Sequence, residues 1–203
     1  MTNNLYQLSA SQLNERPRGN AGRDLALIAV FAAFIGALSI LPSIAVSGAV
    51  PFTFQTLAIY ITAQVLGGVR ASASVALYLL AGFAGLPIFA NGGGGMAAFA
   101  SPSAGYLLGF LPFAFVAGSL GYLFTRKLSN TAAIFGARLG ANLIGFALLT
   151  TCGIIGLMVN AHMPFEKAWV VAIAFVPWDL VKSTLAVLVA LSVHRAFPAL
   201  ARL

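Results

Sequence analysis

Charged side chains are scarce in this chain of 203 residues. Asp, Glu, Lys and Arg together make up 7% of the sequence, whereas a soluble domain carries about a quarter. So few charges cannot cover the surface of a globular domain in water. Hydrophobic residues, in contrast, make up 60% of the chain. The composition therefore predicts an integral membrane protein that has the lipid bilayer as its solvent.

The sequence also lacks the features of several functional classes. A single cysteine, Cys152, excludes an intrachain disulfide and a cysteine-based metal site. His162 and His194 fall on opposite sides of the predicted membrane topology, so we expect no metal site and no cofactor. The glycine run at 92–95 is not a phosphate loop, because no Gly-Lys-Ser/Thr comes after it. Without a nucleophile pair in one span, we predict that the chain is not an enzyme.

The net charge of +7 does not indicate nucleic-acid binding. Such binding requires basic residues clustered on one face, and here they are scattered among apolar segments. The preference of Lys and Arg for the cytoplasmic side of a membrane explains them better.

The apolar segments predict an all-α membrane protein with six transmembrane helices, since about 20 apolar residues cross a bilayer. The polar residues 1–23 are predicted to form a cytoplasmic tail, and residues 24–203 the membrane domain. Pro177 suits the first turn of a helix better than its interior, so we expect the last span to begin there, after a separate short segment at 165–176. The predicted spans are 24–46, 52–66, 71–89, 106–124, 132–159 and 177–194.

The distribution of basic residues predicts the orientation. With the N-terminus inside, Lys167 is the only basic residue of the outer loops. The inner side then holds Arg16, Arg18, Arg23, Arg70, Arg126, Lys127, Arg195 and Arg202. Both termini are therefore predicted to be cytoplasmic. Arg138 lies about two turns into the fifth span, where it could snorkel to the inner surface or face the bundle.

Two charges lie close together in the last apolar stretch, which reads FVPWDLVKST. Asp179 and Lys182 are three residues apart and so share one helix face. With a helix that begins at Pro177, both lie just inside the outer mouth of the bundle. They could form a salt bridge that fixes helix packing, or they could bind a ligand. Ionisable residues inside spans are usually functional, which favours the ligand site.

Further candidate site residues lie in or next to the outer loops. The run Asn91–Gly95 could bring its backbone close to a ligand, through Gly93 and Gly94, or form a flexible loop. Asn91 offers a donor and an acceptor. Tyr106 could contribute a hydroxyl or anchor the chain at the interface. Trp178 could belong to an interfacial belt or form a stacking wall.

The first span carries a stripe of small residues. Ala29, Ala33 and Ala37 recur every four residues, and such stripes let helices approach closely. The stripe could pack within this bundle or dock on a separate membrane protein.

Four segments together resemble the BioY family, the substrate-binding (S) components of energy-coupling-factor (ECF) biotin transporters. They read VPFTFQTL (50–57), LLAGFAGLPIFANGGGG (79–95), SPSAGYLLGF (101–110) and VPWDLVK (176–182). The family usually has Gly-Pro-Thr-Gly-Gly-Tyr where this chain has Ser-Pro-Ser-Ala-Gly-Tyr at 101–106.

The resemblance implies a six-helix S-component fold that captures biotin from outside. It places Asp179, Lys182, the glycine-rich connector and Tyr106 in the binding site. It also implies that the alanine stripe docks on a transmembrane coupling protein driven by two ATPase subunits. The residues 47–53 between the first two spans would form a lid.

The residues alone leave one alternative open. The chain could be a membrane scaffold or assembly protein, with Asp179 and Lys182 as a structural bridge and no transported ligand.

Overall fold

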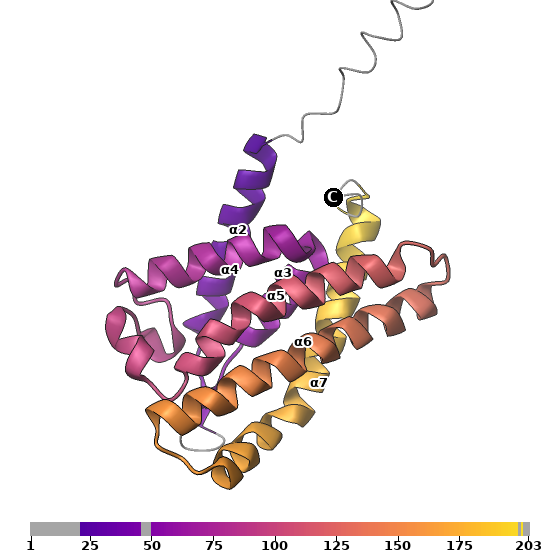
Figure 1. The fold of residues 1–203 in the computed structure, drawn as a ribbon. Coiled ribbons are helices and arrows are strands. Elements are labelled where there is room, and N and C mark those ends of the chain that lie inside the picture. The colour runs from indigo at the N-terminus through magenta and orange to yellow at the C-terminus, as the bar shows by residue number, and fades with distance from the viewer. Residues whose placement is uncertain (1–20, 46–49, 199, 201–203) are drawn as a thin grey trace, which may run out of the picture.

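A computed structural model describes residues 21–45, 50–198 and 200, and it is almost entirely helical (Figure 1). Most of the predicted tail therefore lies outside the described residues. The helices are α2 (Ala21–Ser39), α3 (Gln55–Leu66), α4 (Gly68–Phe83), α5 (Ala104–Thr125), α6 (Thr131–Asn160) and α7 (Phe165–Ala196). Short 3-10 turns, η1 (Ala90–Gly92) and η2 (Met96–Ala100), join α4 to α5. Strands β1 (Ile44–Ala45) and β2 (Pro51–Phe52) pair antiparallel before α3.

The helices differ in their capacity to cross a bilayer. Among the described residues, α2, α5, α6 and α7 are long and apolar enough to do so. The apolar helices α3 and α4 have 12 and 16 residues. At 1.5 Å per residue they reach only ~18 and ~24 Å, against a hydrocarbon core of ~30 Å. The structure thus confirms the all-helical prediction and supports four spans by length.

The predicted start of the last span is wrong. Helix α7 begins at Phe165 and continues through Pro177 without interruption. The segment at 165–176 is largely apolar, like the rest of α7, so both parts form one helix. The backbone group that a proline leaves unbonded is tolerated in membrane helices, as it also is at Pro112 within α5. Asp179 therefore lies about four turns into the helix, ~21 Å from its start, rather than in its first turn.

Helix α3 forms the centre of the bundle. It packs against α7, α5, α4 and α2, and nine of its 12 residues are buried. In Figure 1, α4, α5 and α6 run side by side, and α7 crosses behind α5 and α6. The turn from α3 to α4 is a single residue, Gly67, with a positive φ of 75° that favours glycine. The position of α3 decides where the polar residues of the bundle meet.

Helices α5 and α6 approach each other through glycines. A Cβ atom added to Gly105 would collide with the carbonyl oxygen of Cys152 and lie 2.8 Å from Cα of Gly156. A Cβ on Gly109 would lie 2.9 Å from the Cys152 Cβ. Such small residues allow backbones to pack directly against each other in a membrane. This contact fixes the wall of the bundle that α5 and α6 form.

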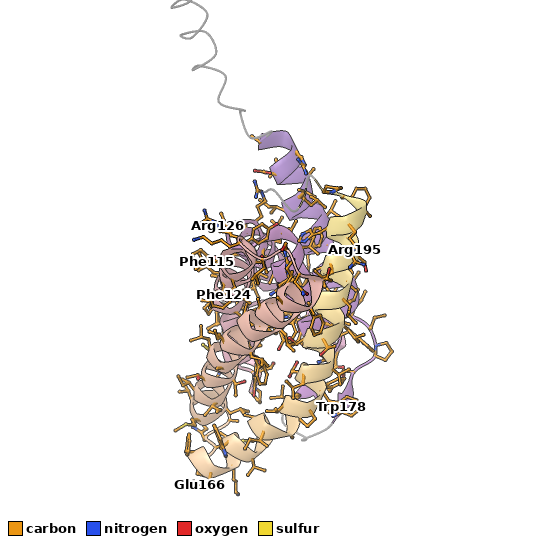
Figure 2. The ribbon with its side chains drawn as sticks, turned by 90° about the vertical axis from the view of Figure 1, so that its right-hand side faces the viewer. Phe115, Phe124, Arg126, Glu166, Trp178 and Arg195 are labelled. Carbon is orange, nitrogen blue, oxygen red and sulfur yellow. The ribbon has the colours of Figure 1, made fainter. Side chains whose placement is uncertain are left out.

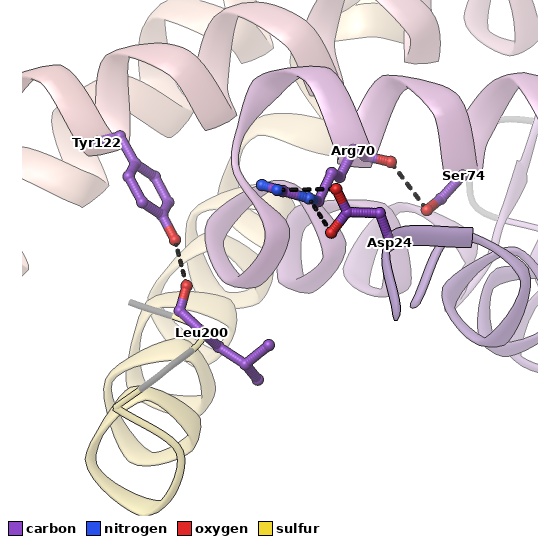
Figure 3. A network of polar contacts seen from close by, with 5 residues as sticks. All are labelled: Asp24, Arg70, Ser74, Tyr122 and Leu200. Atoms are coloured by element: carbon purple, nitrogen blue, oxygen red, sulfur yellow. Dashed lines mark hydrogen bonds and ion pairs between the residues drawn. The ribbon is translucent and has the colours of Figure 1, made fainter. Parts of the chain in front are cut away.

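At the other end of α5, polar contacts connect the start of α2 and the segment after α7 to the bundle (Figure 3). Arg70 of α4 holds Asp24 of α2 with two hydrogen bonds, of 2.9 and 3.0 Å. Ser74 donates to the Arg70 carbonyl at 3.0 Å. Tyr122 of α5 donates to the carbonyl of Leu200 at 2.8 Å. The start of α2 and the segment after α7 are thus attached to the bundle at the same end.

The alanine stripe lies on the outer face of α2. Ala29, Ala33 and Ala37 are all exposed, whereas Ala32 and Ile35 are buried against the bundle. The stripe therefore faces away from the described helices of this chain.

Candidate ligand-binding site

A cavity of about 290 Å³ lies between the β2–α3 segment, the connector from α4 to α5, and helices α5, α6 and α7. Its size is at the lower end of the range for small-molecule sites. Aromatic and aliphatic side chains form much of its wall: Phe89, Leu107, Phe110, Phe146, Leu149 and Phe175. A few polar groups converge on it: Thr53, Gln55, Thr56, Ser101, Ser103, Tyr106, Asp179 and Lys182. An apolar wall with a few fixed polar groups is typical of a site for a small, partly polar molecule.

Lys182 lies in the wall of this cavity and is held from several sides. Its Nζ donates to the Thr53 carbonyl at 2.9 Å and to the Thr56 hydroxyl at 2.7 Å. It also lies 3.7 Å from Oδ1 of Asp179 and 3.8 Å from the centroid of the Phe52 ring. These contacts connect α7 to the start of α3 and balance the charge of the carboxylate.

Asp179 is buried beside it, with 6% of its surface exposed. The Tyr60 hydroxyl of α3 donates to its Oδ1 at 3.3 Å. The Tyr60 ring stacks on Phe113 of α5, with centroids 4.5 Å apart. A buried carboxylate is tolerated only when it is paired and hydrogen-bonded, and both conditions hold here. The carboxylate is thus fixed in the wall of the cavity while it can still accept hydrogen bonds from a ligand.

Tyr106 contributes a hydroxyl to the same cavity. This hydroxyl is buried and has no hydrogen-bond partner among the described residues. The ring packs on Gly153 of α6, where an added Cβ would collide with it, and lies 6.2 Å from the Phe175 ring. Buried polar groups are nearly always hydrogen-bonded, so this hydroxyl is available to a molecule that enters the cavity.

The glycine-rich connector forms a compact turn rather than an open loop. Phe89 N–H donates to the Gly93 carbonyl at 2.9 Å, and Gly95 N–H donates to the Gly82 carbonyl at 2.7 Å. Gly94 packs so closely on the backbone of Leu86 that a Cβ would collide with its carbonyl oxygen. As a result, Gly93 and Gly94 both line the cavity.

Two of the predicted site residues lie outside this wall. Asn91 is exposed, adopts a positive φ of 59°, and accepts a 2.5 Å hydrogen bond from the Ser43 hydroxyl. Trp178 is 52% exposed and packs on Phe52, with centroids 5.2 Å apart. Figure 2 shows it at the edge of the molecule. The structure thus brings Asp179, Lys182, Tyr106, Gly93 and Gly94 together and leaves Asn91 and Trp178 away from the cavity.

The residues of α3 that contact the charged pair of α7 were not predicted from the sequence. Thr56, Tyr60 and Gln64 recur every four residues within an apolar helix. Residues at this spacing share one face. This polar stripe was the available signal, and its first two members meet Asp179 and Lys182.

The predicted lid is only partly described. Residues 46–49 lie outside the described residues. Val50, Pro51 and Thr53 line the cavity, so the described half of the segment 47–53 forms part of its wall.

Comparison with known proteins gives the chain its family. The sequence profile of the BioY family matches residues 9–199. The chain belongs to the BioY family. The biotin transporter BioY of Rhizobium etli is 39% identical over 183 residues, which cover 88% of this chain and 96% of that protein. The biotin transporter BioY of Rhodobacter capsulatus is 36% identical, and the match covers 87% of this chain and 95% of that protein.

A solved structure matches the fold as well. The S-component for biotin from an ECF-type ABC transporter superposes with a TM-score of 0.80 at 26% identity, covering 88% of this chain and 94% of that one. The BioY-like architecture thus extends over most of the chain.

Proposed function

We propose that this chain captures biotin from the outer side of the cytoplasmic membrane and serves as the substrate-binding component of an ECF-type transporter. The observation that carries the proposal is the Asp179–Lys182 pair in the wall of an apolar cavity, in a chain of the BioY family. The two relatives are named biotin transporters, and the structural neighbour is named an S-component for biotin. The matches cover nearly the full length of these proteins.

The chemistry of the cavity suits biotin. Its ureido group has two N–H donors and one carbonyl acceptor, and its ring and chain are otherwise apolar except for a thioether and a terminal carboxylate. Asp179 can accept from the N–H groups, and Lys182 can donate to the ureido carbonyl or to the carboxylate. The free Tyr106 hydroxyl can donate to either acceptor. The phenylalanine and leucine side chains of the wall suit the ring and chain.

The topology we propose has six spans, with α3 and α4 as short ones, and both termini in the cytoplasm. Residues 50–53, the described part of the predicted lid, close over bound biotin, since Val50, Pro51 and Thr53 already form part of the cavity wall. The exposed stripe Ala29, Ala33 and Ala37 docks on a transmembrane coupling protein, which works with two ATPase subunits.

Equilibrium binding of labelled biotin to the detergent-purified chain tests the function. We expect saturable binding by the parent and a loss of at least about 30-fold in Asp179→Asn, since removing the charge of one partner of a buried charge pair costs about 2–5 kcal/mol or more. Asp24→Asn is the matched control, because this carboxylate lies at the other end of the bundle and should leave binding unchanged. Thermal melting confirms that each variant is folded.

The two outcomes separate the proposal from its alternative. A well-folded parent that binds no biotin would contradict biotin capture and favour a scaffold protein with a structural bridge. Binding that survives Asp179→Asn would keep the function but remove Asp179 from the site.

A further inference from the structure

A second cavity, of about 380 Å³, lies at the opposite end of the bundle, between the ends of α5, α6 and α7. Three arginines line it: Arg126, Arg138 and Arg195. Tyr122, Thr125 and Thr131 add hydroxyl groups, and no described acidic residue takes part. Figure 2 shows Arg126 and Arg195 at the same end of the molecule, far from Glu166. This cavity shares no residue with the proposed biotin site.

Arg138 is the buried member of the group, with 5% of its surface exposed. One terminal nitrogen donates to the Gln64 carbonyl at 2.6 Å, and the other lies 3.2 Å from Nδ1 of His194. The guanidinium also lies 5.6 Å from the centroid of the Tyr122 ring. Its Nε is buried without a hydrogen-bond partner among the described residues.

The histidine does not neutralise this charge. A guanidinium can only donate hydrogen bonds, so Nδ1 of His194 must accept. Nε2 then carries the proton and donates to the Val65 carbonyl at 3.1 Å. With one proton on its two ring nitrogens, the His194 imidazole is neutral in this arrangement. Within the described part of the chain, the groups that accept hydrogen bonds from Arg138 are therefore uncharged.

The described carboxylates of the chain lie away from this cavity. The sequence has four acidic residues. Asp24 pairs with Arg70, Asp179 pairs with Lys182, and Glu166 lies at the other end of the bundle. Glu15 lies outside the described residues. Among the residues that the structure describes, Arg138 is thus a buried cation without a carboxylate. Such a charge is strongly unfavourable unless another group supplies the counter-charge.

We propose that this cavity binds a phosphate group, and that an anionic phospholipid of the adjacent leaflet supplies it. Guanidinium groups bind phosphate oxygens with paired, charge-assisted hydrogen bonds, and three arginines line this cavity. Lipid phosphates lie at the ends of spanning helices, where basic pockets between helices bind headgroups.

The apolar surroundings suit the rest of a lipid. Ile134 and Leu191 line the cavity beside the arginines. Phe115 and Phe124 are 51% and 42% exposed, and Figure 2 places both with Arg126 on one side of the molecule. The acyl chains can lie along this surface while the headgroup occupies the cavity. A bound lipid would then tie the ends of α5, α6 and α7 together.

Thermal melting of the purified full chain in detergent tests the site, with phosphatidylglycerol, phosphatidylcholine or inorganic phosphate added. We expect phosphatidylglycerol to raise the melting temperature more than phosphatidylcholine does. Native mass spectrometry should show that Arg138→Gln binds phosphatidylglycerol at least about tenfold more weakly, as expected for the loss of a charged hydrogen-bond donor. The double variant R126Q/R195Q changes only exposed side chains and should also weaken binding, so the test does not depend on the folding of Arg138→Gln.

Lys127→Gln is the matched control. Lys127 is exposed and next to Arg126, but it does not line the cavity, so its loss should leave the lipid selectivity intact. Equal weakening by all variants would mean general attraction of anionic lipid to a basic surface and would overturn the site. A response to inorganic phosphate as large as that to phosphatidylglycerol would keep the phosphate site but replace the lipid with the free ion. No response to either probe would overturn the proposal and leave an acidic partner protein as the source of the counter-charge.

Discussion

The two buried cations Lys182 and Arg138 are accommodated in opposite ways. Lys182 has its counter-charge on the same helix, since Asp179 lies one turn away and 3.7 Å from it. The described partners of Arg138, from α3 and α7, are neutral. An intrahelical pair of opposite charges adds no net charge to the bundle, so the cavity next to it does not need a ligand to supply a counter-charge. A lone guanidinium leaves one positive charge, and it favours an anion from outside the chain.

The largest effect expected from this contrast is that of Lys182→Met. It leaves the Asp179 carboxylate buried without a counter-charge, and breaking a buried pair in this way costs about 3–5 kcal/mol. The double variant Asp179→Asn/Lys182→Met removes both charges and should recover much of the loss. Unfolding monitored in mixed detergent micelles measures both. A double variant that is no more stable than Lys182→Met would mean that the hydrogen bonds to Thr53 and Thr56, not the charge pairing, hold this site together.

A smaller effect is expected for Arg138→Met in mixed micelles of detergent and phosphatidylcholine. This variant leaves the Gln64 backbone carbonyl and Nδ1 of His194 without their donor, but it also removes an uncompensated buried charge, so the loss of stability should be at most about 1–3 kcal/mol. The same unfolding measurement, made beside Lys182→Met, compares the two sites directly. If Arg138→Met were the more destabilising of the two, the guanidinium would have a counter-charge within the chain, and the contrast would fail.

The position of Tyr106 at the first site depends on a glycine. A Cβ in Gly153→Ala collides with the Tyr106 ring, and crowding of this kind costs about 1–3 kcal/mol. If the ring moves out of the cavity, biotin affinity should fall by about five- to 150-fold. Gly140→Ala is the control on the same helix, because nothing lies within 4 Å of its added Cβ. Biotin titrations in which both variants behave like the parent would show that the ring position does not matter for binding.

The smallest effect is expected for Tyr106→Phe. Its hydroxyl has no partner among the described residues, so its removal should leave the stability of the ligand-free chain unchanged or slightly higher. Biotin binding should weaken by about two- to tenfold through the loss of one hydrogen bond. Thermal melting and biotin titration on the same preparation separate the two effects. A destabilised variant with unchanged biotin affinity would make Tyr106 a packing residue.

Much of the fold could be predicted from the sequence because hydropathy alone locates apolar helices. The failure at Pro177 shows the limit of that reasoning. A proline marks a helix start in water, but within a bilayer the chain has no better alternative than to continue the helix. Pro112 lies inside α5 in the same way, and the segment predicted at 106–124 does form one continuous helix there.

The candidate site was predictable only where charge or glycine marked it. Asp179 and Lys182 stand out in an apolar stretch, and the cavity does contain them. The exposure of Asn91 and Trp178 depends on how the connector and α7 turn, which a residue type does not indicate. Arg138 could be placed in the helix but not oriented, because a long basic side chain can reach the surface or the bundle from the same position.

The glycine contact between α5 and α6 has a consequence for the order of assembly. The two helices are neighbours in the chain, joined by residues 126–130, so their contact closes only a short loop. They can pair as a hairpin while α7 is still being synthesised, with Tyr106, Phe110 and Leu149 already on one surface. Helix α7 then joins the hairpin with Asp179 and Lys182 already paired with each other. Neither charge therefore has to enter the bilayer without its partner.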